Sequence, residues 1–158
     1  MIENYLKILE ESLQKKIAVL DEISAYNEEQ KELLSEEVIS MEAVDANMQK
    51  KDALVQKILD LDDGFETLYD RVREQLMGNT ALYKLQIKRL QDLISIVTEK
   101  SVSIQAQEAR NKKLVENYFA KERSSIGRGR QASKAAYDYY RNMNNTNVVP
   151  AQIMDQKK

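Results

Sequence analysis

The amino-acid sequence predicts an all-α protein, an elongated antiparallel bundle or coiled coil of three long helices plus a short mobile C-terminal helical segment. Three observations lead to this expectation. The 158 residues include only four glycines and one proline, so almost nothing interrupts a helix. Apolar residues recur three or four positions apart over long stretches, as on one face of a helix. The 42% apolar content includes only two phenylalanines, which favours a thin seam between helices over a thick core.

The first helix is predicted over residues 3–36. Its apolar seam consists of residues three or four positions apart, namely Ile2, Leu6, Leu9, Leu13, Ile17, Leu20 and Ile23. Asn27, Gln30 and Lys31 stand where this seam would continue. We expect that polar stretch to be frayed or exposed to solvent.

The second helix is predicted over residues 40–77, with Ser40 as its N-cap. Its seam keeps a 3-4-3-4 spacing over five heptads, which is typical of coiled-coil packing. The seam residues are Met41, Val44, Met48, Lys51, Val55, Ile58, Asp62, Phe65, Tyr69, Val72 and Leu76. Gly64 lies inside this helix, and we expect a kink or a close helix crossing there.

A tight reversal is predicted at Gly78-Asn79-Thr80, where the glycine ends one helix and the threonine caps the next. The third helix would then fold back against the second. Its seam is Tyr83, Ile87, Leu90, Ile94, Val97, Ser101 and Ile104. Residues 105–113 are polar, and they should lie opposite another polar zone or be open to a partner.

Gly127 and Gly129 end the helical pattern and introduce a basic hinge. We therefore divide the chain into a long-helix bundle, residues 1–125, and a flexible C-terminal segment with a short amphipathic helix, residues 126–158. The second part is expected to be mobile when no ligand is bound.

Enzymatic activity is not expected, because the chain has neither histidine nor cysteine. The usual general bases, thiol nucleophiles and zinc ligands are therefore missing, and we expect no cofactor and no metal. Acidic residues could attract a hard cation, but they lack the alternating ligand loop of a calcium site and are expected on a solvated helix face: Glu36, Glu37, Asp60, Asp62 and Asp63. The N-terminus lacks the pattern of a signal peptide, and no apolar run is long enough to span a membrane.

Charge is distributed unevenly: residues 1–77 hold 19 acidic and 9 basic side chains, whereas residues 78–158 hold 7 and 15. The favoured interpretation is attraction between antiparallel helices of opposite charge. An acidic or nucleic-acid partner for the basic half is the alternative. Basic residues alternate with Tyr137, Tyr139 and Tyr140 near the C-terminus, but no nucleic-acid-binding module surrounds them, so a segment that binds protein is preferred.

Several stretches resemble the FlgN-type flagellar export chaperones. The opening helix Tyr5-Leu6-Lys7-Ile8-Leu9-Glu10-Glu11-Ser12-Leu13 and the stretch Lys50-Lys51-Asp52-Ala53-Leu54-Val55 are similar to the pattern of this family. So are residues 101–114, with the family's asparagine at Asn111 and its apolar residue at Leu114, and the closing Met154-Asp155-Gln156-Lys157-Lys158. The resemblance covers nearly the whole chain. The hinge Arg128-Gly129-Arg130 and the tyrosine-rich C-terminal segment depart from the family.

The resemblance implies a cytoplasmic chaperone built from long antiparallel helices. Its clients would be the hook-filament junction proteins, also called hook-associated proteins, whose C-terminal amphipathic helices must be covered before assembly. It also implies delivery of the client to the flagellar export gate or its ATPase complex, after which the chaperone stays inside the cell.

The client-binding surface is predicted in the C-terminal third of the chain. A partner helix would lie on the sparsely apolar face of the third helix, and the C-terminal segment would close over it. The predicted client-binding residues are Asn111, Leu114, Val115, Tyr118, Phe119, Ile126, Tyr137, Tyr140 and Met143. Without a client, we expect the C-terminal segment to fold back onto this face.

Two other functions stay open at this point. The chain could be a structural coiled-coil protein that self-associates through the heptad face of its second helix. Its C-terminal segment could also bind nucleic acid, although no nucleic-acid partner is expected. Sedimentation distinguishes the first alternative, since a chaperone would be a monomer or a weak homodimer.

Overall fold

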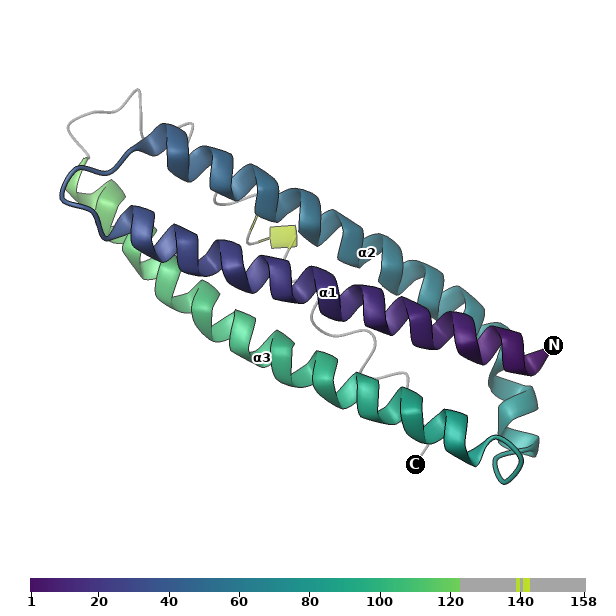
Figure 1. Cartoon of the computed structure of the whole chain (residues 1–158). Coiled ribbons are helices and arrows are strands. Elements are labelled where there is room, and N and C mark those ends of the chain that lie inside the picture. The colour runs from purple at the N-terminus through teal and green to yellow at the C-terminus, as the bar shows by residue number, and fades with distance from the viewer. Residues whose placement is uncertain (123–138, 140, 143–158) are drawn as a thin grey trace.

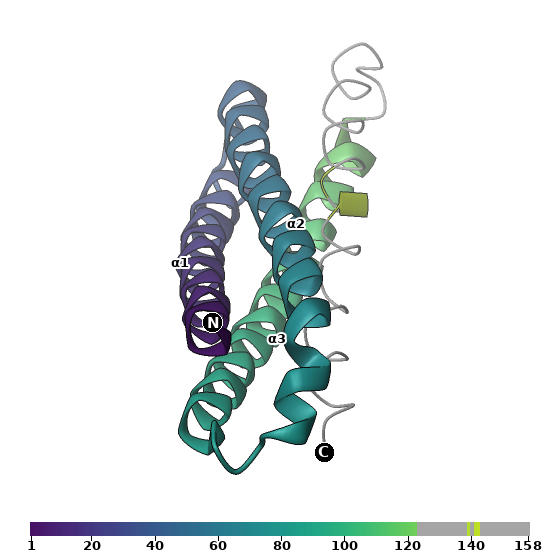
Figure 2. The same ribbon diagram turned by 90° about the vertical axis from the view of Figure 1, so that its right-hand side faces the viewer.

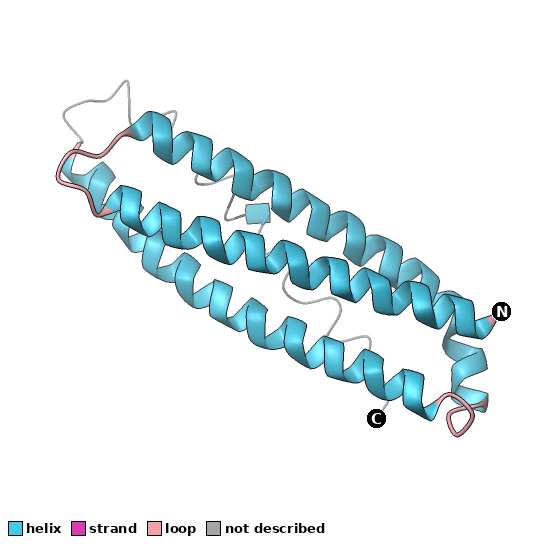
Figure 3. Cartoon of the chain, viewed as in Figure 1, coloured by secondary structure: helices cyan, strands magenta, loops and turns pink. Residues whose placement is uncertain are grey.

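The structure is a computed structural model in which residues 1–122, 139 and 141–142 are described. Three long helices make up nearly all of this part: α1 (Ile2–Leu34), α2 (Met41–Gly78) and α3 (Lys84–Lys121). They run antiparallel in succession and are joined by two short loops (Figures 1 and 3). No strand occurs among the described residues. The predicted all-α helical bundle is therefore confirmed.

Helix α1 packs along both other helices, whereas α2 and α3 make few backbone approaches to each other. This arrangement is visible in Figures 1 and 2. The expectation that the third helix would fold back against the second was therefore wrong. The chain does reverse after Gly78, but α3 crosses over to lie against α1.

Seam residues form the core. On α2 every predicted seam position from Val44 to Leu76 is buried, and only Met41 at the start is half-buried. Most of these side chains join one apolar cluster with residues of α1 and α3, such as Leu9, Ile23 and Leu90. The heptad spacing thus placed the core of α2 correctly.

The helix ends follow local chemistry in most places. The Ser40 hydroxyl accepts a hydrogen bond from the Ala43 amide at 3.3 Å, so the predicted N-cap of α2 is confirmed. Helix α2 ends at Gly78, as expected, but α3 is preceded by Tyr83 rather than capped by Thr80. The five residues from Asn79 to Tyr83 therefore form the reversal before α3 begins.

The structure contradicts two expectations about the helix interiors, namely a close helix crossing at Gly64 and fraying in α1. A Cβ atom added at Gly64 would meet no described atom within 4 Å, so no neighbouring helix crosses close to it. The polar stretch of α1 is not frayed, because α1 runs unbroken to Leu34, and Asn27 and Gln30 are fully buried. Only Lys31 in that stretch is exposed.

None of the described helices has a stretch long and apolar enough to cross a lipid bilayer.

Candidate helix-binding site

Helices α1, α2 and α3 take three corners of a four-cornered bundle. Because α1 contacts both α2 and α3 and these two scarcely approach each other, α2 and α3 stand on a diagonal. Their facing sides border the position that a fourth helix takes in a four-helix bundle. We call this position the fourth corner.

Tyr139 lies at the fourth corner. Figure 2 shows its short segment beside α2 and α3, on the side away from α1. Its side chain is completely buried and joins the main apolar cluster of the bundle. The backbone at Tyr139, Arg141 and Asn142 is helical. The fourth corner is thus occupied at this point by a helical residue of the same chain.

Contacts with both α2 and α3 hold this segment. The ammonium group of Lys51 lies 4.1 Å from the centre of the Tyr139 ring, within the range of a cation-π interaction. The Tyr139 hydroxyl donates a hydrogen bond to the Glu108 carboxylate. Three residues later, the side-chain amide of Asn142 donates to Asp52 Oδ1 at 2.8 Å. Residues three apart lie on one face of a helix, so Tyr139 and Asn142 dock together.

Lys51 connects the fourth corner to the interior of the bundle. Its Nζ atom lies 3.2 Å from Glu108 Oε1 on α3 and donates to Gln30 Oε1 on α1 at 2.6 Å. Burial lowers the pKa of Lys51 to about 8, although the Glu108 carboxylate opposes this change. The charged form of Lys51 is thus held by one carboxylate, one amide oxygen and one aromatic ring.

Asn111 completes a buried polar layer across the bundle. Its side-chain amide donates to the Asn27 carbonyl oxygen at 2.9 Å and to Gln30 Oε1 at 3.0 Å. We use the name polar layer for five buried side chains on the three helices: Asn27, Gln30, Lys51, Glu108 and Asn111. The polar zone of the third helix therefore lies opposite the polar stretch of the first, which was one of the two outcomes expected from the sequence.

Polar contacts continue toward the solvent side of α1 and α3. Gln107 Nε2 donates to Ser24 Oγ at 3.0 Å, and Arg110 lies 3.2 Å from Glu28 Oε1. Lys100 pairs with Asp21 at 2.6 Å. The two ion pairs join the acidic first half of the chain to the basic second half, as the charge distribution predicted. Their side chains are between 35% and 58% exposed, so each contributes little to stability.

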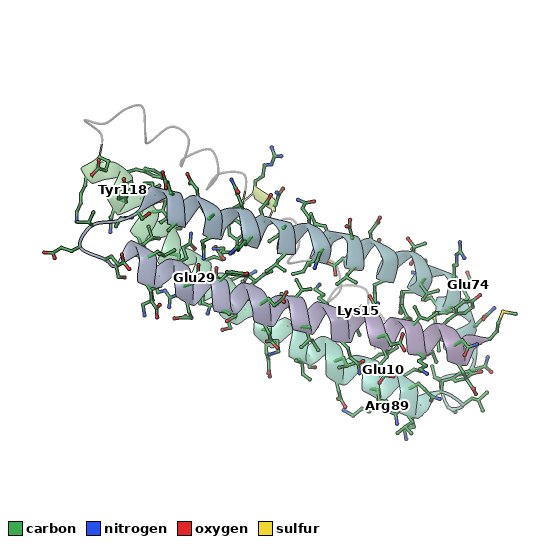
Figure 4. The ribbon with its side chains drawn as sticks, turned by 45° about the horizontal axis from the view of Figure 1, so that its top comes forward. Glu10, Lys15, Glu29, Glu74, Arg89 and Tyr118 are labelled. Carbon is green, nitrogen blue, oxygen red and sulfur yellow. The ribbon has the colours of Figure 1, made fainter. Side chains whose placement is uncertain are left out.

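The predicted client-binding residues of α3 occupy one end of the bundle. Val115 is buried in a second apolar cluster with Leu34, Val44 and Met48, and Leu114 and Phe119 pack against that cluster. Tyr118 is half-buried, and its ring meets the Phe119 ring edge-on at 5.7 Å. Figure 4 shows Tyr118 at the end of α3, near the loop that joins α1 to α2.

The structure brings the described members of the predicted site together, but it turns two of them inward. Asn111 and Val115 face the bundle interior, so their first partners are α1 and α2 rather than solvent. The remaining predicted residues, Ile126, Tyr137, Tyr140 and Met143, lie outside the described residues. The predicted mobility of residues after 125 falls there as well.

A second buried ion pair joins α1 to α2 further along the bundle. Lys16 Nζ lies 2.7 Å from Asp62 Oδ1, and both side chains are less than 10% exposed. Burial lowers the pKa of Lys16 and raises that of Asp62, while their attraction opposes both changes. Asp62 therefore belongs to the seam and not to the solvated acidic face on which we had also placed it.

Three important residues were not predicted: Lys16, Glu108 and Tyr139, in whose place the neighbouring Tyr137 and Tyr140 were chosen. The spacing of the seam would have identified Glu108, because the series Ser101, Ile104 continues with Glu108, Asn111 and Val115 at the same steps of three and four. Lys16 gives no comparable signal, since Ile17 next to it was the expected seam residue and is only half-buried.

In comparisons with known proteins, no family model, no curated protein and no solved structure matches this chain.

Proposed function

We propose that this chain is a cytosolic export chaperone that binds an amphipathic helix of its client at the fourth corner. The clients we propose are the C-terminal helices of flagellar hook-filament junction proteins, which the chaperone covers and delivers to the export apparatus. Recognition of this kind lays the apolar face of a helix into a groove between two others.

The occupied fourth corner carries this proposal. A helical residue from outside the three-helix bundle, Tyr139, is buried between α2 and α3. The facing sides of α2 and α3 thus accept a helical segment that is not one of the three long helices. A helix from another protein that offers the same kinds of side chain can take the place of this segment.

The type of client comes from the sequence. The resemblance of residues 5–13, 50–55 and 101–114 to FlgN-type chaperones supports flagellar clients. Lys51 lies in the second of these stretches, and Glu108 and Asn111 lie in the third. Two of the three stretches therefore supply the side chains that meet at the fourth corner or directly beneath it.

Titration calorimetry of the full chain with synthetic C-terminal helices of hook-filament junction proteins tests the proposal. We expect binding of one helix per chain. We also expect Tyr139→Ala to bind more tightly than the unchanged chain, because its own segment competes less well for the same position.

Tyr5→Ala is the matched control, since it removes a tyrosine from the start of α1 without touching the fourth corner. Its affinity for the client helix should equal that of the unchanged chain. The absence of binding to any of these helices would contradict the proposed clients. A tight homo-oligomer in sedimentation, with no client binding, would favour the self-associating coiled coil instead.

A further inference from the structure

The side chains around Tyr139 contact both parts of a phenol, its aromatic ring and its hydroxyl group. The Lys51 ammonium group lies 4.1 Å from the ring centre, where the ring presents its electron-rich side. The Glu108 carboxylate accepts a hydrogen bond from the hydroxyl group. We call Lys51 and Glu108, together with the space that Tyr139 fills, the tyrosine socket.

The socket discriminates between side chains because its own charged groups are buried. Lys51 is 0% and Glu108 is 6% exposed. A leucine in the socket would keep these groups away from water and offer neither a ring nor a donor to compensate. A phenylalanine would restore the ring but not the hydrogen bond. The order of preference is therefore tyrosine, then phenylalanine, then leucine.

The interior side of the socket is fixed independently of its occupant. Lys51 donates to Gln30 at 2.6 Å, and Gln30 in turn accepts from Asn111 at 3.0 Å. Both partners lie in the bundle, on α1 and α3. The polar layer thus holds Lys51, and Lys51 in turn holds the Glu108 carboxylate at 3.2 Å, so the socket keeps its form when the occupant changes.

We propose that the tyrosine socket is a recognition site for a tyrosine on an amphipathic helix, filled by Tyr139 in the free chain and by a client tyrosine in the complex. This inference rests on the proposed function. A client helix that displaces the segment of Tyr139 uncovers Lys51 and Glu108, and a tyrosine in the same position supplies the contacts that these groups lose. Asp52, which accepts from Asn142, favours a hydrogen-bond donor three residues after that tyrosine.

The socket itself can be tested without a client. The protein is the full chain with Tyr139→Ala, and the probe is a peptide that copies residues 131–146, with tyrosine, phenylalanine or leucine at position 139. We expect the leucine peptide to bind at least about tenfold more weakly than the tyrosine peptide, the ratio for one hydrogen bond to a charged group. The phenylalanine peptide should be intermediate.

Lys51→Met in the same protein should remove the part of this preference that comes from the ring, so that the phenylalanine peptide no longer binds more tightly than the leucine peptide. Lys50→Met is the matched control, because it removes the neighbouring, exposed lysine and leaves the socket intact. The peptide variants leave the protein unchanged, so their result does not depend on whether Lys51→Met folds. Equal affinity of the tyrosine and leucine peptides would contradict the inference that the socket recognises tyrosine.

A double-mutant cycle tests whether a tyrosine of the client fills the socket in the complex. Each tyrosine of a bound client helix is replaced by leucine, and binding is measured to chains carrying Lys51→Met or Lys50→Met. One client tyrosine should be coupled to Lys51 by at least about fivefold, as expected for groups in contact. A bound client without any coupled tyrosine would overturn the inference and leave the proposed function standing. A tyrosine preference with the peptides but no client binding would leave the tyrosine socket standing and contradict the proposed function.

Discussion

Charged side chains inside a helical seam need partners, and this bundle supplies them at two positions. Lys51 pairs with Glu108 and Lys16 with Asp62, at 3.2 and 2.7 Å. Removing two charges from water costs free energy that the attraction between them only partly offsets. Such pairs therefore contribute less to stability than to the alignment of one helix on another, because only one register brings both partners together.

Removal of one partner of a buried ion pair should cost much more stability than removal of both, and variants of the Lys16–Asp62 pair test this. Asp62→Leu alone leaves the Lys16 ammonium group buried without its carboxylate, and we expect it to lower the free energy of unfolding by about 3–5 kcal/mol. The double variant Lys16→Met/Asp62→Leu removes both charges. It should be as stable as the unchanged chain, or more stable by about 1–4 kcal/mol. Urea denaturation followed by circular dichroism measures both.

Lys88→Ala is the control for this pair, since it breaks the ion pair with Asp92 on the exposed surface of α3. It should change the free energy of unfolding by no more than about 0.5 kcal/mol. If the double variant were as unstable as Asp62→Leu, the pair would be a main source of stability and not chiefly a means of aligning the two helices.

The buried Lys51 makes stability depend on pH in an unusual direction. Burial lowers the pKa of Lys51 from 10.5 to about 8 in the folded chain, so the unfolded chain holds its proton to higher pH. Between these values unfolding takes up a proton, and the folded state gains stability as the pH rises. From pH 7 to 9.5 we expect the free energy of unfolding to rise by about 2 kcal/mol relative to a variant without this pair.

Lys51→Met/Glu108→Gln is that reference variant, because it removes both charges and keeps an acceptor at position 108. Urea titrations at each pH give the difference between the two chains, in which the ionisation of other groups cancels. A difference that stays constant over this range, or falls, would contradict a lowered pKa of Lys51.

At the scale of single helices, the start of α2 depends on one side chain. The Ser40 hydroxyl accepts from the Ala43 amide at 3.3 Å and satisfies one of the free amides of the first turn. Ser40→Ala should lower the free energy of unfolding by about 1 kcal/mol, whereas Ser40→Gly should cost only a few tenths. Thermal unfolding of the two variants under the same conditions provides the comparison. Equal losses would mean that the hydroxyl does not act as the cap.

The spacing of apolar residues predicted the helices well because it is a property of each helix alone. It placed Lys51 and Asp62 in the seam of α2, where both are buried. It failed where the answer depends on a second helix. The burial of Asn27 and Gln30 follows from hydrogen bonds to Gln107, Lys51 and Asn111, side chains that are 21 to 81 positions away. Nothing in the local pattern of α1 contains that information.

The packing partner of α3 and the site at the fourth corner could not be predicted from the local sequence either. Both depend on how one helix packs on another. A tight turn after Gly78 fixes the reversal of the chain but not the neighbour on which the next helix lies. The sequence placed the candidate site in the C-terminal third, and Glu108, Asn111 and Tyr139 do lie there. It did not show that α2 provides the opposite wall through Lys51.

At the scale of the whole molecule, the polar layer separates two unequal apolar clusters. The larger one has 18 buried members among the described residues, and the smaller has four, at the end where α1 passes into α2. Because stability against local opening comes mainly from buried apolar contacts, the smaller end should open first. Hydrogen exchange should therefore be faster at amides of residues 28–34, 41–50 and 109–121 than at those of residues 6–23, 54–72 and 90–104.

Mass spectrometry of peptic fragments measures this difference along each helix. The comparison is internal, since every helix contributes a segment to both ends of the bundle. Uniform protection along α1 would show that the bundle opens as a single unit and that the polar layer does not divide it.

The central position of α1 also bears on the order in which the protein is assembled during synthesis. Its contacts with α2 form across a loop of six residues, from Ser35 to Ser40, so this hairpin can close as soon as α2 has left the ribosome. Its contacts with α3, such as Asp21 with Lys100, join residues 79 positions apart. Contacts so distant along the chain form late, because closing a long loop costs more entropy. One flank of α1 therefore stays bare until α3 has been made, and the fourth corner is the last part of the molecule to exist.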